Sequence, residues 1–598
     1  MINKKNILEE IFQLDFNTDL AELNDKMLAA SSIKNFFTNI EEYQVWKDWS
    51  QDGELSVGAR EFGDFQTPTD LAERVCKLLI ANGINPTTII EPTFGKGNFI
   101  HASINNFKNI HKVYGVEIQK PYEMYLKKDI LETNATHILK DKNITLEIHH
   151  DDFFKHEFPE CLIDGNEELL IIGNPPWITV AELSTLSSAN MPEKSNFKKY
   201  SGLDAITGKS NFDLSEYIII KLLKMLDKAQ KGTLALLCKN SIAKNIVYSL
   251  PNYDWNVTTV ELYNFDAKKE FNVATDASLF LVRIGEPHKQ RVNTCDVYDL
   301  SNPNNKLRTY GWINDKFVSN VDSYQDSSSV DNVSPLTWRS GVKHDSSKIM
   351  ELKVLEDKPL ENGLKEIVDV EDHLIYNLLK SSDLKKETIP NKTRKKVIIT
   401  QRKVGQDTSY IKEESPKLWD YLVNHKEYLD KRKSSIYKGK PDFSIFGIGD
   451  YSFAPYKVAI AGMYKKSNFS LVMPINGKPV MLDDTCYFLS FNKYLDAVFT
   501  LLILNSELVQ KFLKSLVFID TQRPYTKDTL MRIDILEATK HLSLDDLLDY
   551  AKDFDIYIPL DISGDDYANY IERLSARPDS FFEGNVDSAN IQEELSLW

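Results

Sequence analysis

Short apolar runs and longer amphipathic stretches alternate along residues 70–285. Runs typical of buried strands cover residues 87–90, 113–118, 144–148, 169–172, 232–238, 258–263 and 277–284. Apolar residues recur at helical spacing in 71–80 and 214–229. Strands that alternate with helices predict a doubly wound α/β domain, which we place at residues 59–286. A long polar loop at 180–212 interrupts it.

The pattern changes on both sides of this domain. Residues 1–58 carry apolar residues at helical spacing and predict an N-terminal helical segment: Leu8, Ile11, Phe12, Leu20, Leu23, Met27 and Leu28. Residues 287–335 are rich in Asn, Asp and Ser and predict a linker. Residues 336–544 predict a mixed α+β domain that ends in an apolar helix over 497–516. Residues 545–598 predict an acidic, solvated helical segment.

Composition narrows the class of protein. Of the 598 residues, 42% are hydrophobic and 27% are charged, which is typical of soluble globular proteins with several domains. No apolar run approaches the length of a membrane span, and no secretory signal begins the chain. The five scattered cysteines show neither metal-ligand spacing nor a disulfide framework. We therefore expect a cytoplasmic protein with no membrane partner and no metal.

The net charge of −16 argues against a generic nucleic-acid binder. Its distribution is uneven, because residues 545–598 hold fourteen acidic and three basic residues. Basic residues cluster at 392–402 and 431–440. Aromatic residues begin within the second cluster and continue beyond it. A local basic face therefore remains compatible with the acidic total.

Residues 169–177 read Leu-Leu-Ile-Ile-Gly-Asn-Pro-Pro-Trp. A proline cannot donate to a sheet ladder, so Pro175 and Pro176 end the strand that the apolar run predicts. The stiff backbone then holds the amide of Asn174, two carbonyls and the indole of Trp177 at the carboxyl end of a strand. Ligands of open α/β sheets bind at that edge. Such a site suits a planar aromatic amine.

A loop after the first strand of the domain suits a close-lying ligand. Glu91 precedes Gly95 and Gly97, which permit a tight turn. The spacing matches neither the dinucleotide fingerprint nor a phosphate-binding P-loop. Upstream, Thr67 or Thr69 can cap the helix that residues 71–80 continue, with Pro68 near its first turn, and Phe65 lies beside them. These residues serve either as a simple helix entry or as part of the ligand site.

The next two strand ends carry further polar residues. Glu117 lies about 20 residues beyond the glycines, where nucleotide-binding folds hold a ribose. Asp152 and Phe153 follow the third strand and suit an adenine amine and its ring. His149 and His150 are adjacent, so their side chains diverge, and no third ligand is spaced to complete a metal site.

Together these motifs resemble the gamma group of S-adenosylmethionine-dependent N6-adenine DNA methyltransferases. The resemblance covers Glu-Pro-Thr-Phe-Gly-Lys-Gly-Asn-Phe at 91–99, Asp-Phe at 152–153 and Asn-Pro-Pro-Trp at 174–177, with Phe-Gln-Thr-Pro at 65–68 ahead of them. Residues 440–535 resemble the TaqI-like C-terminal specificity domain more loosely. The resemblance implies a Rossmann-like methyltransferase domain followed by a target-recognition domain. The chain differs in having Trp177 and Phe94 where the family has commoner residues.

The resemblance also implies roles for single residues. It places Asn174, Pro175, Pro176, Trp177 and Phe271 at the target base, which is flipped out of duplex DNA. It places the cofactor S-adenosylmethionine against Phe65, Thr67, Pro68, Glu91, Gly95, Gly97, Glu117, Asp152 and Phe153. Fixed acceptors on the adenine amine would turn its lone pair toward the methyl group, so positioning carries the catalysis.

Double-stranded DNA is the expected partner, together with a cognate restriction endonuclease or another defence subunit. Candidate phosphate-binding residues are Arg394, Lys395, Arg402, Arg432 and Lys433. Three alternatives stay open: an RNA methyltransferase, a protein-glutamine methyltransferase, and a noncatalytic recognition subunit.

Overall fold

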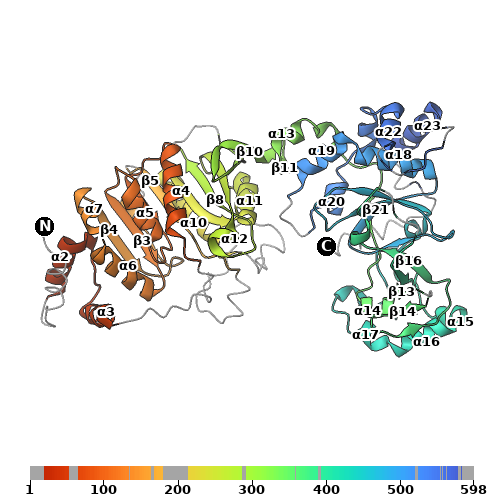
Figure 1. The fold of residues 1–598 in the computed structure, drawn as a ribbon, viewed down its shortest axis with the longest axis horizontal. Helices are drawn as coiled ribbons and strands as arrows, with labels where there is room; N and C mark the ends of the chain where they lie inside the picture. The colour runs from red at the N-terminus through yellow and green to blue at the C-terminus, as the bar shows by residue number, and fades with distance from the viewer. Residues whose placement is uncertain are drawn as a thin grey trace. The chain divides into compact units, whose positions relative to one another are not determined.

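The computed structural model divides into two compact units, Met1–Phe317 and Val318–Trp598 (Figure 1). Each unit has its own hydrophobic core. The residues that it describes are 19–52, 65–133, 135–162, 167–179, 213–285, 291–356, 359–387, 389, 392–518, 523–552, 554, 556–559, 562–576 and 581. The polar loop predicted at 180–212 lies outside them.

An eleven-stranded sheet forms the centre of the first unit. In spatial order its strands are β1 (Ile33–Lys34), β4 (Thr145–His150), β3 (Lys112–Glu117), β2 (Thr88–Glu91), β5 (Leu169–Gly173), β6 (Gly232–Lys239), β8 (Ala277–Ile284), β7 (Val257–Phe265), β9 (Thr294–Asp299), β10 (Asn302–Ile313) and β11 (Lys316–Val318). The strands from β1 to β6 pair in parallel, whereas β8 runs antiparallel to both β6 and β7. This order confirms the Rossmann-like α/β prediction.

Helices cover both faces of this sheet. They are α4 (Thr69–Ala81), α5 (Asn98–Asn106), α6 (Lys120–Glu132), α7 (Ala135–Asp141), α10 (Leu214–Ala229), α11 (Asn240–Ser249) and α12 (Ala267–Phe271), with 3-10 turns at Glu160–Leu162 and Leu250–Asn252. Alternate residues of β5 face opposite sides. Leu170 belongs to the same core cluster as Val75 of α4 and Ile104 of α5, whereas Leu169 and Leu226 of α10 both lie beside Gly232 of β6. Because both faces are covered, the strands read as continuous apolar runs.

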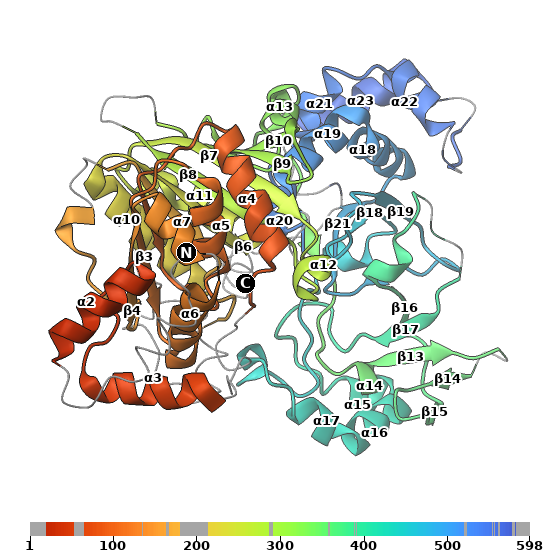
Figure 2. The same cartoon turned by 60° about the vertical axis from the view of Figure 1, so that its left-hand side comes forward.

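The N-terminal segment is helical, as predicted, but it belongs to the first unit. Helices α2 (Leu20–Ser31) and α3 (Ile40–Asp52) flank β1, which pairs with β4 through Ile33 and Leu146. Figure 2 shows both helices, in red, at this end of the sheet. Their buried residues, such as Met27 and Trp46, join the core of the domain. The predicted helical residues Leu8, Ile11 and Phe12 lie outside the described residues.

The linker predicted at 287–335 is wrong. Strand β9 pairs with β7, and β10 pairs with β9, so both continue the sheet. In β9, Cys295 and Val297 are buried while their neighbours are more exposed. This alternation is the mark of a strand with one wet face, and the polar positions obscure it in the sequence. Short helices α13 (Val321–Gln325) and η3 (Ser328–Val330) follow.

The second unit is a mixed α+β domain, as predicted. A four-stranded sheet has the order β12 (Arg339–Ser340), β21 (Cys486–Phe491), β18 (Tyr456–Ala461) and β19 (Phe469–Val472). A six-stranded sheet has the order β15 (Ile367–Val368), β14 (Leu360–Glu361), β13 (Glu351–Val354), β17 (Lys395–Ile398), β16 (Ile375–Leu379) and β20 (Met481–Leu482). Its helices are α14 (Ser347–Met350), α15 (Ile411–Glu414), α16 (Pro416–Asn424), α17 (Lys426–Asp430), α18 (Tyr494–Asn505), α19 (Glu507–Leu516), α20 (Lys527–Leu530), α21 (Ile535–Thr539), α22 (Leu544–Ala551) and α23 (Gly564–Ser575).

The apolar helix predicted over 497–516 is two helices, α18 and α19, which meet at Ser506. Ser506 has extended backbone angles, φ −60° and ψ 154°. Just before it, the side chain of Asn505 accepts from the Phe469 N–H at 3.1 Å and donates to the Phe469 carbonyl at 3.0 Å. The side-chain amide of Asn505 thus pairs with the backbone of β19 in the way that a neighbouring strand would. Asn505 is the last residue of α18, so the helix ends where this pairing is made.

Helices α22 and α23 are part of the second unit and do not form the solvated appendage that was predicted. The Tyr570 hydroxyl lies 2.9 Å from the Thr500 hydroxyl of α18. Arg573 forms an ion pair with Asp496 of the same helix. Helices α22 and α23 are thus amphipathic. Their apolar faces are buried, and their acidic residues belong to the opposite face. Throughout the described parts of the chain, every helix is too short or too polar to cross a bilayer.

Candidate active site

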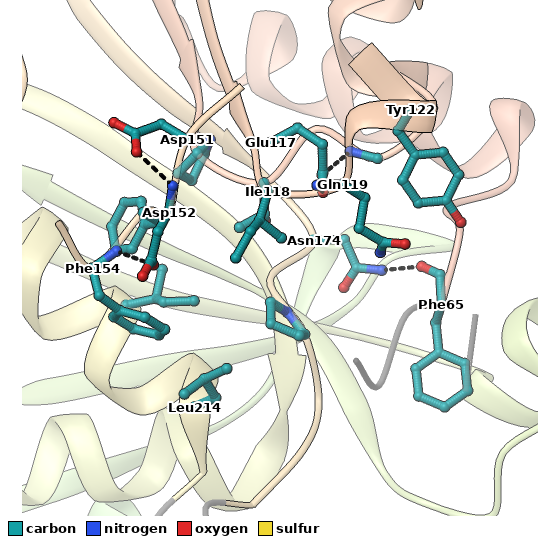
Figure 3. A pocket seen from close by; sticks show the side chains of 16 residues that line it. Phe65, Glu117, Ile118, Gln119, Tyr122, Asp151, Asp152, Phe154, Asn174 and Leu214 are labelled. Carbon is teal, nitrogen blue, oxygen red and sulfur yellow. Dashed lines mark hydrogen bonds between the residues drawn. The ribbon is translucent and has the colours of Figure 1, made fainter. Parts of the chain in front are cut away.

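A cavity opens at the carboxyl ends of β2, β3, β4 and β5, the edge that the strand pattern predicts (Figure 3). It encloses about 700 Å³ of open space. Its lining residues are Phe65, Pro92, Thr93, Gly95, Glu117, Ile118, Gln119, Tyr122, Asp151, Asp152, Phe153, Phe154, Asn174, Pro176, Leu214 and Ile218. A smaller cavity of about 250 Å³ adjoins it at Phe65, Thr93, Gly95 and Asn174, and extends to Glu91 and Thr67. Parallel strands bring these distant residues together.

The loop after β2 turns through two glycines with left-handed backbone angles. Gly95 has φ 53° and Gly97 has φ 79°. A Cβ at Gly95 would lie 2.7 Å from the side chain of Gln66. Gln66 is held there because its Oε1 accepts from the Lys96 N–H at 2.9 Å. Gly95 lines both cavities, and its left-handed backbone angle and the nearby Gln66 side chain both disfavour a side chain at this position.

Segment 65–68 lies against the glycine loop. The Asn98 side chain donates to the Thr67 carbonyl at 2.6 Å. Thr67 is buried, and Pro68 precedes the first residue of α4. The structure thus brings Phe65 and Thr67 to the two cavities, with Pro68 behind them at the helix entry.

Glu117 ends β3 and faces the larger cavity. One carboxylate oxygen accepts from the Gly95 N–H at 2.8 Å, and the other accepts from the Gln119 N–H at 2.8 Å. These two bonds fix the plane of the carboxylate at the junction of the glycine loop and α6. The side chain is therefore placed to accept from hydroxyl groups of a ligand.

Glu91 ends β2 and is 2% exposed. Among the described residues, its Oε2 has no hydrogen-bond partner. Burial raises the pKa of this carboxyl well above its usual range, and the charge of Glu117 adds to the effect. A buried acid with a free oxygen beside a cavity is a site for a cationic ligand group.

Asp152 and Phe153 lie on the opposite wall. Asp152 accepts from the Phe154 N–H at 2.9 Å, as Figure 3 shows. Lys221 of α10 donates to the carbonyls of Phe153, at 2.7 Å, and Phe154, at 3.1 Å. This lysine fixes the turn that presents the acid and the buried ring of Phe153.

His149 and His150 point in different directions. The His149 ring stacks on Tyr114 at 4.4 Å, and His150 contacts the carbonyl of Ile118 at 2.9 Å. Among the described residues, no three His, Cys, Asp or Glu side chains are grouped as metal ligands.

Asn174 follows β5 directly and lines both cavities. Its side-chain N–H donates to the Phe65 carbonyl at 2.8 Å (Figure 3). Its Oδ1 is buried and has no hydrogen-bond partner among the described residues. The amide is thus held in one orientation, with its acceptor left for a ligand.

Trp177 and Phe271 lie behind Phe65 and line neither cavity. The Trp177 ring is 5% exposed and lies 5.7 Å from Phe65 and 5.3 Å from Phe271 between ring centres. Pro176 lines the larger cavity, and Pro175 is buried beside it. Phe271 ends α12, where a loop was expected. Of the predicted target-base residues, Asn174 and Pro176 therefore line the larger cavity, whereas Trp177 and Phe271 pack against the ring of Phe65.

A curated relative decides the family. The chain is 40% identical over 476 residues to the type II methyltransferase M.NspV of Nostoc sp., an alignment that covers 79% of this chain and 96% of the relative. The chain belongs to the type II methyltransferases. It is thus a DNA methyltransferase of the restriction–modification type, and its methyl donor is S-adenosylmethionine. No family model matches the sequence of this methyltransferase.

Solved structures similar to the methyltransferase are distant. One is a class I S-adenosylmethionine-dependent methyltransferase of Listeria monocytogenes, described as putative, with a TM-score of 0.29 and 13% identity over 50% of this chain and 85% of that chain. Another is the type IIG restriction endonuclease BpuSI, with a TM-score of 0.36 and 14% identity over 100% of this chain and 71% of that chain. The family assignment rests on the sequence relative.

The pocket of the methyltransferase fits its cofactor. The free acceptor of buried Glu91 suits an ammonium group, and the acids at the ends of β3 and β4 suit hydroxyl and amine groups. The backbone at Gly95 also lines the cavity, at a position where a Cβ would meet the side chain of Gln66. S-adenosylmethionine carries all of these groups.

Several lining residues of the methyltransferase were missed in the sequence. They are Gln66, Thr93, Gln119, Tyr122, Phe154, Leu214 and Ile218. Gln119 and Tyr122 begin α6 directly after the acid of β3, so their place beside a strand end was readable. Leu214 and Ile218 carry only the signal of an apolar helix, which does not separate a pocket wall from a core.

The five predicted phosphate-binding residues have different surroundings in the second unit. Arg394 pairs with Asp383, and Lys395 lies 2.5 Å from Glu351. Arg432 donates to the carbonyls of Leu429 and Ser444, each at 2.7 Å, and its guanidinium lies 3.7 Å from the Tyr437 ring centre. Arg402 is exposed above the Phe453 ring at 4.2 Å, and Lys433 is exposed.

Proposed function

We propose that this methyltransferase is a site-specific DNA adenine-N6 methyltransferase that flips its target base out of the duplex. The free Oδ1 of Asn174 carries the proposal. It is a buried acceptor at the carboxyl end of β5, fixed by the bond from the side-chain N–H of Asn174 to the Phe65 carbonyl, on a residue that lines both cavities. An exocyclic base amine supplies the missing donor.

We assign each chemical group of S-adenosylmethionine to the pocket residues whose chemistry matches it. Glu91 would bind the ammonium group, and the loop from Gly95 to Gly97 would bind the rest of the amino-acid moiety. Glu117 would accept from the ribose hydroxyls. Asp152 would accept from the adenine amine of the cofactor, and Phe153 would pack on that ring. Phe65, Thr67 and Pro68 would line the methionine end.

S-adenosylmethionine supplies an electrophilic methyl group on a sulfonium. The N6 lone pair of adenine is delocalised into the ring, so the amine is a weak nucleophile. Asn174 Oδ1 and the Pro175 carbonyl would accept its two hydrogens and turn the lone pair toward the methyl group. The N6–C bond would form as the C–S bond breaks, which would leave S-adenosylhomocysteine as a neutral thioether and a cationic methylated amine that releases one N6 proton to solvent. Catalysis of this kind depends on positioning.

The target amine lies inside the duplex, so the base must leave the stack to reach Asn174. The aromatic group of Phe65, Trp177 and Phe271 lies beside this amide. Phe65 lines both cavities and would supply part of the stacking that the extruded base loses, with Trp177 and Phe271 packed against its ring. The second unit would bind double-stranded DNA and select its sequence, in partnership with a cognate restriction endonuclease.

Methylome sequencing of cells that express the wild-type chain, with an Asn174→Ala variant as the control, tests the proposal. We expect one new N6-methyladenine motif in the wild-type sample only. Mass spectrometry of the digested nucleosides identifies the methylated base. N4-methylcytosine in the digest would refute the choice of adenine. Methyl transfer to RNA or protein without DNA methylation would favour an alternative substrate, and no transfer at all would favour a noncatalytic subunit.

A further inference from the structure

The Asn-Pro-Pro-Trp turn is held at its two ends. Pro175 and Pro176 have no N–H, so the middle of the turn cannot be fixed by backbone donation. At the first end, Asn174 donates to the Phe65 carbonyl at 2.8 Å. At the second end, the Nζ of Lys239 donates to the Trp177 carbonyl at 3.2 Å.

Lys239 is the last residue of β6, the strand that pairs in parallel with β5. Its ammonium also donates to Asp213 at 2.8 Å. The Asp213 side chain is 6% exposed and that of Lys239 is 23% exposed, so water screens this pair only in part. A pair withdrawn from water in this way depends on exact geometry, because each charge needs its partner.

Asp213 connects the lysine to the wall of the cavity. It caps α10 by accepting from the Ser215 N–H at 3.1 Å and from the Ser215 hydroxyl at 2.6 Å. The adjacent Leu214 N–H donates to the Ile178 carbonyl, one residue beyond Trp177, at 2.9 Å. Leu214 also lines the larger cavity. Lys239 therefore joins the end of the turn to the helix beside the cofactor site.

We propose that Lys239, held by Asp213, is a positioning residue that sets the place of the Asn-Pro-Pro-Trp turn relative to the cofactor pocket. The inference rests on the proposed function of that turn. Lys239 donates to the backbone of Trp177, and it is not one of the residues assigned to the cofactor. Its loss should therefore slow methyl transfer and leave cofactor binding nearly unchanged, since a small displacement of a reacting group costs much rate.

The test compares Lys239→Met, which removes the donor, with Lys239→Arg, which keeps one, and Asp213→Asn, which keeps an acceptor for the cap. Lys231→Met is the matched control, because Lys231 lies just before the opposite end of β6 in a surface pair with Glu168. Turnover is measured on a duplex with the motif found by methylome sequencing, and S-adenosylmethionine affinity by calorimetry. Hydrogen exchange of residues 171–179 reports the turn without needing activity.

We expect Lys239→Met to lower kcat by roughly 10–100-fold, with KM and cofactor affinity within about threefold of wild type. Lys239→Arg should restore most of kcat, Asp213→Asn should lower it several-fold, and exchange at 177–179 should be faster in the Met variant.

An unchanged kcat together with unchanged exchange would overturn the inference, as would a parallel loss of turnover and cofactor binding. If the Met variant does not fold, a wild-type kcat in Asp213→Asn overturns it. An inactive wild type refutes the proposed function, and the exchange measurement still decides this inference.

Discussion

The side-chain N–H of Asn174 donates to the backbone carbonyl of Phe65, 2.8 Å away and 109 positions earlier in the chain. This one bond decides which end of the amide faces the cavity. The nitrogen is used within the protein, and the oxygen is left buried without a described partner. The acceptor chemistry of the site thus depends on a segment that lies between β1 and β2 in the chain.

Removal of the Asn174 amide should abolish most turnover and leave cofactor binding intact. We expect Asn174→Ala to lower kcat by on the order of 10²–10³-fold, the usual cost of losing one aligned hydrogen bond in an active site. Single-turnover transfer of labelled methyl groups measures the rate. Asn105→Ala, which changes an exposed amide on α5, should match wild type. Retention of kcat in Asn174→Ala would remove this residue from the chemistry.

Cofactor affinity should rise with pH. Burial, aided by the charge of Glu117, raises the pKa of Glu91 well above its usual range, so the carboxyl of the cofactor-free protein keeps its proton to a higher pH than an ordinary glutamate does. A ligand ammonium favours the carboxylate, so binding releases this proton. The same shift affects folding. The contribution of neutral Glu91 to the free energy of unfolding is present at low pH and is lost as the pH rises through the raised pKa.

Calorimetry in two buffers of different ionisation enthalpy measures the proton released on binding. We expect a fractional release in wild type that disappears in Glu91→Gln, which cannot ionise. Wild-type affinity that does not change with pH would show that Glu91 is already ionised before the cofactor arrives.

A buried charge network joins the N-terminal segment to α6. Lys127 is 2% exposed, contacts Glu42 at 3.5 Å, and also binds Glu123 and the Phe36 carbonyl. Burial alone would raise the pKa of Glu42, but the charge of Lys127 and a hydrogen bond from Lys120 bring it to about 2. The carboxylate therefore contributes stability above its unfolded pKa, and that contribution is lost as pH falls toward 2.

We expect Glu42→Ala to lower the free energy of unfolding by roughly 3 kcal/mol at neutral pH, because Lys127 loses a partner inside the protein. Urea denaturation measures the difference, which should shrink below the usual glutamate pKa. Glu41→Ala, on the exposed side of α3, should cost less than about 0.5 kcal/mol. Equal effects of the two variants would contradict a structural role for the network.

The predicted DNA-binding residues should separate into two groups. Arg402 and Lys433 are exposed and show no ion pair in the described parts of the chain. We expect Arg402→Ala and Lys433→Ala each to reduce the salt dependence of DNA affinity by about one contact. Arg432→Ala should instead destabilise the second unit, because its guanidinium holds two backbone carbonyls.

Titration of duplex DNA at several salt concentrations, with thermal unfolding in parallel, measures both effects. Lys431→Ala is the matched control, since Lys431 pairs with Glu427 at 2.6 Å on the surface. A salt dependence unchanged in both Arg402→Ala and Lys433→Ala would place the phosphate contacts elsewhere.

The sequence by itself determined the α/β core and the residues at its strand ends. Glu91 and Glu117 are the last residues of their strands, Asn174 follows β5, and Asp152 lies two residues beyond β4. Both an apolar run and its polar end are local features. Parallel pairing of consecutive strands then places such ends at one edge, so the site could be predicted without coordinates.

Only the tertiary structure decided which of the polar groups at the strand ends have hydrogen-bond partners within the protein. The alternation in β9 is hidden by polar residues on its wet face, and the break at Ser506 depends on the backbone of Phe469. Lys239 and Arg432 resemble any other basic residue in the sequence, yet each holds backbone carbonyls that the fold brings to it. Hydrogen bonds between segments far apart in the chain require the folded geometry, and for this reason the orientation of the Asn174 amide could not be read from its motif.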